Sequence, residues 1–249
     1  MNMACYARHI LSRFSIMKLA IHQPEFMPWP GFFNLMALSD LYIVLDHVQF
    51  KKRYFENRNQ LVSPSSKTLF VGVPVITKNR YYQSICEVEI DNSQNWKKKL
   101  LLTIFHNYKK SPYFSKYYNN FCFLIEKKQY NRLLDLNMEI IVFLRQQLKI
   151  NTPMICSSEF DLSSVKGSEL ILKLCLLTNT KVYLSGKFGR NYLKVEHFKS
   201  NGIQIKWIDY ETPFYKQQCN NFVKSLSVLD LLFNHGENSY KILSNNTFL

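Results

Sequence analysis

The sequence predicts an α/β fold, and three observations lead to this prediction. Short apolar strands alternate with helical stretches, polar residues follow directly after the first two strands, and 47% of the 249 residues are hydrophobic. The opening order of strand, helix and strand is the repeating unit of a parallel sheet. We therefore expect a Rossmann-like sheet core, with ligands bound outside the carboxyl ends of its strands.

The opening unit spans residues 18–46. Residues 18–21 are predicted as a strand that ends at His22-Gln23-Pro24, and a proline-rich loop then leads into a helix over residues 31–38. Residues 41–46 form an apolar strand closed by Asp46. Both strands thus carry polar residues at the carboxyl end, where an α/β protein places its ligand.

The middle of the chain changes from strand to helix patterning. Residues 69–76 and 85–90 alternate in polarity and are predicted as a β pair near the sheet edge. From about residue 96 to 150 the pattern is helical, with Leu133, Leu136, Ile140, Leu144 and Leu148 on one helix face. This stretch is expected to form a helical lobe inserted into, or packed on, the sheet core.

The last third returns to alternating elements, which complete one domain over residues 17–240. We expect helices at 167–178 and 225–233 and strands at 182–185 and 203–208. Ser227 and Asp230 have the spacing of a capping box, and Gly236 suits the end of that helix. Residues 1–16 are expected to be an extension before a true start at Met17, and residues 241–249 a frayed end.

Composition narrows the possible environments. The net charge is +14, but lysine outnumbers arginine 24 to 8 and asparagine is plentiful, which favours A/T-rich codons and a solvated lysine surface over an anionic partner as the source of the charge. The six cysteines are scattered without metal-binding spacing, so we expect a reducing cytoplasm and no metal site. No apolar run approaches the roughly 20 residues of a membrane helix.

Four segments could carry chemistry, and each contains a rare glycine or arginine, with Gly236 in the last of them. In the first, His22 and Gln23 precede a helix opened by Gly31, whose free N–H groups could hold an anion. The alternative is a rigid proline turn. In the second, Asp46 could serve as general base, metal ligand or ribose acceptor. The planar groups that follow suit a phosphate or sugar, the alternative being a basic surface loop, and they are Gln49, Arg53, Asn57, Arg58 and Asn59.

The third and fourth segments give weaker signals. Ser185-Gly186 and Arg190-Asn191-Tyr192 surround two glycines after a strand, which could form an anion-binding nest but match neither a Walker A loop nor GxGxxG. Tyr215 and Gln217 precede the last helix, where a structural role is the stronger interpretation. The chain has no GxSxG or HExxH motif, so nothing favours a hydrolase.

Taken together and in order, these blocks resemble the WbqC-like family over about residues 17–236. The resemblance implies a bacterial protein of O-antigen, lipopolysaccharide or other surface-polysaccharide biosynthesis. It also implies attachment of an acyl or aminoacyl group, such as glycyl, to a nucleotide-linked 4-amino sugar. The opening unit is similar to that of HIGH-type nucleotidylyltransferases and pantothenate synthetase, which implies ATP binding, although Pro28-x-Pro30-Gly31 replaces the HxGH motif.

The leading hypothesis is therefore an N-acyl or N-aminoacyl transferase acting on a nucleotide-activated amino sugar. His22 would be the general base, because an imidazole with a pKa near 6.5 can accept a proton from an amine at neutral pH. Asp46 would orient His22 or hold the sugar. Arg53, Arg58 and Arg190 would bind pyrophosphate or the oxyanion, and Asn57 and Asn59 the sugar hydroxyls.

Three alternatives stay open. The lysine clusters and interleaved tyrosines favour an RNA-binding or aminoacyl-tRNA-using protein. The similarity to pantothenate synthetase favours an amide ligase that uses ATP and magnesium through an acyl-adenylate. A non-catalytic scaffold of a polysaccharide assembly complex would bind no small molecule. The sequence identifies neither the acyl donor nor the oligomeric state.

Overall fold

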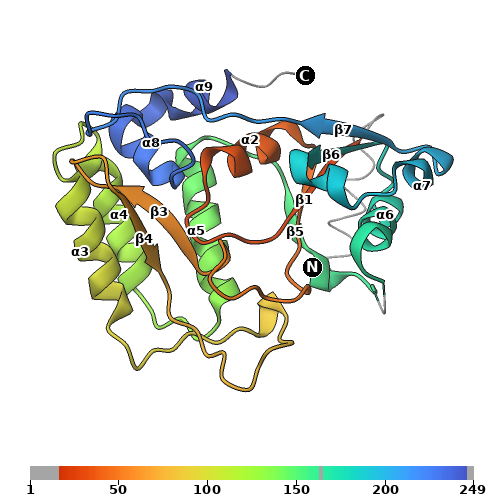
Figure 1. The fold of residues 1–249 in the computed structure, drawn as a ribbon, viewed down its shortest axis with the longest axis horizontal. Helices are drawn as coiled ribbons and strands as arrows, with labels where there is room; N and C mark the ends of the chain where they lie inside the picture. The colour runs from red at the N-terminus through yellow and green to blue at the C-terminus, as the bar shows by residue number, and fades with distance from the viewer. Residues whose placement is uncertain (1–16, 163–164, 246–249) are drawn as a thin grey trace.

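The computed structural model describes residues 17–162 and 165–245 and is organised around a five-stranded parallel sheet (Figure 1). The strand order is β5-β2-β1-β6-β7, and every neighbouring pair is parallel. This confirms the predicted Rossmann-like α/β core. The strands are β1 (Lys18–His22), β2 (Leu41–Val44), β5 (Met154–Cys156), β6 (Val182–Gly186) and β7 (Gln204–Ile208).

The centre of the sheet is a topological switch point. From β1 the chain continues to β2 and β5 on one side, whereas β6 and β7 lie on the other. Ala20 pairs with Leu184, so two residues further along each strand His22 and Gly186 reach the same edge of the sheet. In open α/β sheets the crevice at such a switch point is where ligands bind.

Helices cover both faces of the sheet. Leu19 and Ile21 of β1 pack into the cluster under α6 and α7, whereas Ala20 packs into the larger cluster with α2, α5 and α8. Burial on both faces explains why the strands are nearly continuous apolar runs. The helices are α2 (Pro30–Leu38), α3 (Trp96–Tyr108), α4 (Phe114–Glu126), α5 (Leu133–Gln147), α6 (Gly167–Leu177), α7 (Val195–Ser200), α8 (Val228–His235) and α9 (Ser239–Ser244).

The predicted helical middle of the chain consists of α3, α4 and α5, which pack together and against α8. Leu136, Ile140 and Leu144 are fully buried, as their spacing predicts. Within residues 17–162 and 165–245 there are also four short 3-10 segments, and they are η1 (Ile85–Glu87), η2 (Ser157–Glu159), η3 (Lys187–Asn191) and η4 (Gly236–Asn238).

The predicted β pair of residues 69–76 and 85–90 is wrong. Residues in the first range form β4 (Thr68–Gly72), which pairs antiparallel with β3 (Arg58–Val62) in a separate two-stranded sheet. The second range contains η1 and contributes only isolated bridges, Val75 to Ile90 and Glu89 to Arg132. A turn of five residues joins β3 to β4, so their pairing closes a much shorter loop than the predicted one.

The two ends of the chain were expected to be an extension, at residues 1–16, and a frayed end, at residues 241–249. The predicted extension, residues 1–16, lies outside the described residues. Residues 241–244 are not frayed, because they belong to α9, where Leu243 is fully buried. None of the described helices combines the length and the apolar character needed to cross a membrane.

Candidate functional site

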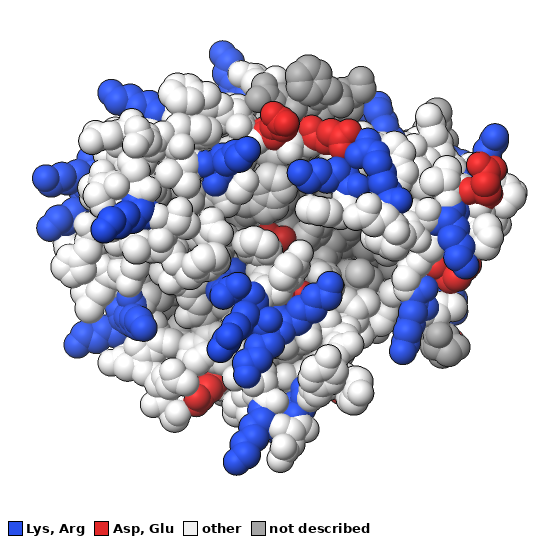
Figure 2. Space-filling view, in the orientation of Figure 1, with Lys and Arg blue, Asp and Glu red and all other residues white. Residues whose placement is uncertain are grey.

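The candidate site lies at the carboxyl end of β1, in the segments that follow β1 and β2. Figure 2 shows a hollow in the middle of one face, with acidic atoms on its floor and lysine and arginine side chains around it. The orange segments after β1 and β2 cross the same region in Figure 1. The site therefore combines a basic rim with an acidic floor.

His22 ends β1 with one ring nitrogen occupied and the other available. Its Nδ1 lies 2.9 Å from the carbonyl oxygen of Gln23, which can only accept, so Nδ1 carries the hydrogen and Nε2 an unshared electron pair. Burial lowers the pKa of His22, so the ring is neutral at pH 7, yet 36% of the side chain is exposed. An accessible neutral imidazole of this tautomer is suited to general-base chemistry.

Two carboxyl groups, Glu25 and Glu56, lie beside this ring. Glu25 Oε1 is 3.9 Å from His22 Nε2, and the two glutamates are 7% and 1% exposed. Oε2 of Glu25 and both carboxyl oxygens of Glu56 are buried without a hydrogen-bond partner from another described residue. Burial raises the pKa of Glu25 to about 8 and that of Glu56 to about 7. At neutral pH the pair can therefore both hold and release protons.

Buried hydrogen bonds fix the two segments that carry these glutamates. The Phe26 amide donates to the Phe55 carbonyl, and the Asn137 side chain of α5 donates to the carbonyls of Glu56 and Pro24. Asn59, predicted to bind a sugar, is fully buried and instead donates to the carbonyls of the 23–29 loop. The glutamates are thus held before any ligand arrives.

Analysis of the sequence missed Glu25 and Glu56, although both lie inside segments it selected. The chain has 18 acidic against 32 basic residues, and each glutamate is next to a phenylalanine. An acid beside aromatic residues, in a chain where acids are scarce, was the available signal.

Asp46 does not reach His22. It is buried at the end of β2, where its carboxylate accepts hydrogen bonds from the Ser157 and Ser158 hydroxyls and from the Ser158 amide, at 2.6–2.9 Å. No hydrogen bond or ion pair joins it to His22 among the described residues. Asp46 therefore anchors η2 to the sheet, and the predicted orientation of His22 by Asp46 is wrong.

The three predicted arginines lie apart from one another. Arg53 is exposed in a turn with a positive φ of 60°, and Arg58 lies in β3 with its guanidinium 4.6 Å from the Phe70 ring centre. Arg190 makes a bidentate pair with Asp209 at 2.6 and 2.7 Å. Of the three, only Arg190 has its charge matched by a described carboxylate.

The remaining residues of the first two segments have mixed environments. Gln49 is exposed and donates to the Tyr81 carbonyl, whereas Asn57 donates to the Val73 carbonyl. Gln23 is half-buried and its carbonyl receives the His22 hydrogen bond. Gly31 lies under the Trp29 ring, where an added Cβ would come within 2.3 Å. That contact explains the glycine by packing.

The β6 loop lies beside the site at the same sheet edge. Ser185 is buried at the end of β6, next to Gly189, where a Cβ would come within 2.1 Å of the Ser185 hydroxyl oxygen. Gly186 has open space around it, and the Tyr192 hydroxyl is hydrogen-bonded to that of Tyr183. The β6 loop thus lies at the sheet edge that β6 shares with β1, and its backbone is packed tightly at Gly189.

Tyr215 and Gln217 do not face this site. Both donate to the buried Asp230 carboxylate, at 2.9 and 3.0 Å, and Tyr108 donates to its other oxygen at 3.0 Å. Ser227 caps α8 as predicted, but Asp230 turns inward to these donors, so the predicted capping box is wrong. Gly236 ends α8 with a positive φ of 56°, as predicted.

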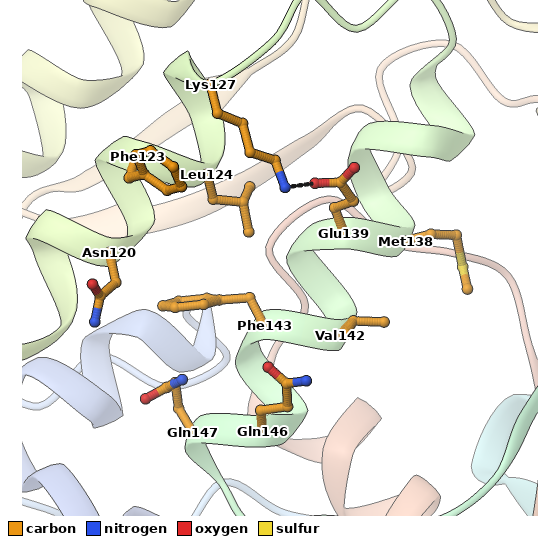
Figure 3. A pocket seen from close by; sticks show the side chains of 10 residues that line it. All are labelled: Asn120, Phe123, Leu124, Lys127, Met138, Glu139, Val142, Phe143, Gln146 and Gln147. Carbon is orange, nitrogen blue, oxygen red and sulfur yellow. Dashed lines mark ion pairs between the residues drawn. The ribbon is translucent and has the colours of Figure 1, made fainter.

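Another cavity, between α4 and α5, is a weaker candidate. Figure 3 shows apolar side chains such as Phe143 lining this cavity. Its charged lining residues, Lys127 and Glu139, form an ion pair with each other. In the described part of the chain, no three His, Cys, Asp or Glu side chains are grouped so that they could hold a metal ion. The β1 end therefore has the best-developed chemistry.

Comparison with known proteins agrees with the order of the sequence blocks. Residues 23–242 match the WbqC-like protein family. The chain is 32% identical over 220 residues to the uncharacterized protein Rv1507c of Mycobacterium tuberculosis, an alignment that covers 88% of this chain and 94% of that protein. No solved structure matches the chain. The protein therefore belongs to the WbqC-like family.

Proposed function

We propose that the protein is an N-acyl or N-aminoacyl transferase that acts on a nucleotide-activated amino sugar for O-antigen or other surface-polysaccharide biosynthesis. The observation that carries this proposal is the neutral His22 ring beside two buried carboxyl groups, three of whose oxygens accept no hydrogen bond from another described residue. An amine needs a base before it can attack, and the switch point of a parallel sheet is where such a substrate would lie.

The glutamates would receive the amine of the sugar. An ammonium group donates three hydrogen bonds, and Glu25 and Glu56 together offer three buried oxygens that await donors. A basic rim above an acidic floor matches a ligand that is anionic at its diphosphate and cationic at its amine. Charge therefore supports a nucleotide-linked amino sugar over a plain anion.

The transfer step can be written with these groups alone. One proton of the ammonium passes to a Glu56 carboxylate, and the free amine nitrogen attacks the acyl carbon of an activated donor, such as a thioester or acyl-adenylate. As the N–C bond forms, His22 Nε2 takes the second proton. The bond between the acyl carbon and its carrier then breaks, and the imidazolium returns that proton to the leaving group.

The first test is the substitution His22→Ala with His106→Ala as the matched control. His106 is exposed on α3, away from β1. Removing a general base should lower kcat by about 10²–10⁴-fold while KM for the amino sugar changes little. Turnover is measured by mass spectrometry of the acylated sugar, with UDP-, dTDP- and GDP-linked amino sugars and several acyl donors. Unchanged turnover in His22→Ala would remove the base from this mechanism.

A tRNA-using protein is the second candidate, because Lys98, Lys99, Lys109 and Lys110 are all exposed along α3 and just after its end. Bound tRNA would have to release counterions, so its affinity would fall steeply as salt rises. A thermal shift with tRNA alone, lost at moderate salt, would favour this candidate. A shift with one nucleotide-linked amino sugar would favour the transferase.

A further inference from the structure

A cavity of about 570 Å³ lies between the β3–β4 hairpin and the first turns of α3. Its polar and aromatic lining includes Asn57, Arg58, Phe70, Asn95, Trp96 and Lys99, and none of the residues that line it is acidic. Glu56 turns toward His22 whereas the next residue, Asn57, lines this groove. The groove is therefore separate from the acidic site but joined to it by one peptide unit.

The two cations of the groove are unpaired. Arg58 and Lys99 make no ion pair with any described carboxylate, unlike Arg80 and Arg190, which bind Glu89 and Asp209. The Arg58 guanidinium stacks 4.6 Å from the Phe70 ring centre, and 56% of Phe70 is exposed. This stack forms a flat platform of the kind on which a nucleobase can lie.

Two further features of the groove, Gly72 and the Asn57 side chain, leave space and a hydrogen-bond acceptor for a ligand. Gly72 pairs with Arg58, and a Cβ there would come within 2.8 Å of the Asn57 carbonyl and 2.9 Å of the Arg58 Cβ. The Asn57 Oδ1 is buried and accepts no hydrogen bond from the described part of the chain. A glycine at this position thus keeps Arg58 in place, and the free amide oxygen awaits a donor from a ligand.

The start of α3 adds to the positive field in the groove. Asn95 makes no side-chain cap, and the first turn of this 13-residue helix has no acidic residue. Its first N–H groups therefore lack side-chain acceptors close to Lys99. Together with Arg58 they make a region where an anion is stabilised.

We propose that this groove binds a nucleoside diphosphate. The base stacks on the Arg58–Phe70 platform, the diphosphate lies between Lys99 and the start of α3, and the Asn57 Oδ1 accepts a hydrogen bond from the nucleoside. That the nucleotide is the carrier of the amino sugar rests on the proposed function, because the sugar would then extend past residues 56–57 toward His22. Nucleotide binding itself stands on the groove alone.

Titration calorimetry of the full chain with UDP, dTDP, GDP and ADP tests this inference. At least one of the four nucleotides should bind, and Arg58→Met and Lys99→Met should each raise its Kd about tenfold or more. Arg58→Lys should restore little, because lysine keeps the charge but not the plane. Lys98→Met is the matched control, since Lys98 is exposed on the same helix but outside the groove. The affinity of the Lys98→Met protein for the nucleotide should be unchanged.

The possible outcomes separate this inference from the proposed function. No binding of any nucleoside diphosphate, or an equal loss in Lys98→Met and Lys99→Met, would overturn the groove as a site and indicate a diffuse polyanion surface. Glu56→Gln should leave the affinity for the free nucleotide unchanged. If Glu56→Gln weakens binding of the nucleotide-linked amino sugar, the groove holds the nucleotide part of that substrate. If binding of the nucleotide-linked amino sugar is unchanged, the groove serves a separate nucleotide such as ATP. The groove remains a site in both cases.

Discussion

Two buried carboxyl groups of this protein have nearly the same exposure and opposite surroundings. Asp230 is fully buried in α8 and accepts hydrogen bonds from Tyr108, Tyr215 and Gln217. Glu56 is 1% exposed, and no other described residue donates to either of its oxygens. Burying an acid without donors costs several kcal/mol, so the first arrangement stabilises the fold and the second does not.

The same division extends to a second pair. Asp46 accepts three hydrogen bonds from the Ser157–Ser158 turn, whereas Oε2 of Glu25 accepts none from any residue that the structure describes. The satisfied carboxylates join distant parts of the chain, and the unsatisfied ones share the end of β1 with His22. Hydrogen-bond satisfaction therefore separates these two pairs of acids, whereas burial does not.

The largest expected effect on stability is at Asp230, whose carboxylate has its hydrogen-bond donors. Asp230→Ala removes the acceptor of three buried donors and should lower the free energy of unfolding by about 3–5 kcal/mol. Urea denaturation followed by circular dichroism measures the change. Asp209→Ala, which removes an exposed partner of Arg190, is the control and should remain close to the parent protein. Equal behaviour of the two variants would break the comparison.

Asp46→Ala should have the next largest effect, about 2–3 kcal/mol of lost stability, because the Ser157 and Ser158 donors lose their acceptor. Its turnover, measured below its melting range, should stay within a few fold of the parent. A large loss of kcat in a folded Asp46→Ala protein would return this residue to the catalytic site.

The sequence predicted the parallel sheet because periodicity and strand composition are local properties. The same holds for the long buried helix face of α5, whose leucine spacing repeats over four turns. It could not predict that residues 58–62 pair with 68–72, because the pattern of Arg58-Asn59-Gln60 is polar and resembles a loop. The element β5, three residues long, is below the length at which a pattern can be recognised.

The sequence selected the segments that form the candidate site but not the two glutamates within them. His22 was found because it follows a strand, and strand ends are visible in a sequence. Whether Asp46 or Glu25 lies beside it depends on where β5 and η2 fall, since their serines satisfy Asp46. Such long-range donors leave no trace in the spacing of residues, so the missing partners of Glu56 could be recognised only in the structure.

The pH dependence of stability sharpens the comparison. Because the pKa of Glu25 is raised to about 8, the folded state keeps a proton that the unfolded state releases above about pH 4.5. Stability should therefore fall as pH rises to 8, by about 1.4 kcal/mol per pH unit for a carboxyl that stays protonated in the folded state. Asp230, whose pKa is about 6, contributes with the same sign only up to that pH.

Denaturation curves at pH 6, 7 and 8 check this prediction, with Glu25→Gln as the informative variant. Glutamine cannot titrate, so the slope between pH 7 and 8 should flatten, whereas Glu56, with a pKa of about 7, and Asp230, with a pKa of about 6, keep part of the fall in stability at lower pH. A slope that is the same with and without Glu25 would show that this carboxyl has solvent or a partner in the folded protein.

The smallest effect on stability is expected for Glu56→Gln, which should stay within about 1 kcal/mol of the parent and become the more stable protein at pH 8. The substitution removes no hydrogen bond from another residue, and it replaces an acid whose ionised form is buried by a neutral amide of the same shape. Turnover should nevertheless fall about 10²-fold or more, because a neutral amide cannot take the proton of the ammonium. Glu126→Gln, at the exposed end of α4, controls for the change itself. Loss of stability together with retained turnover in Glu56→Gln would reverse the comparison and make this glutamate a structural residue.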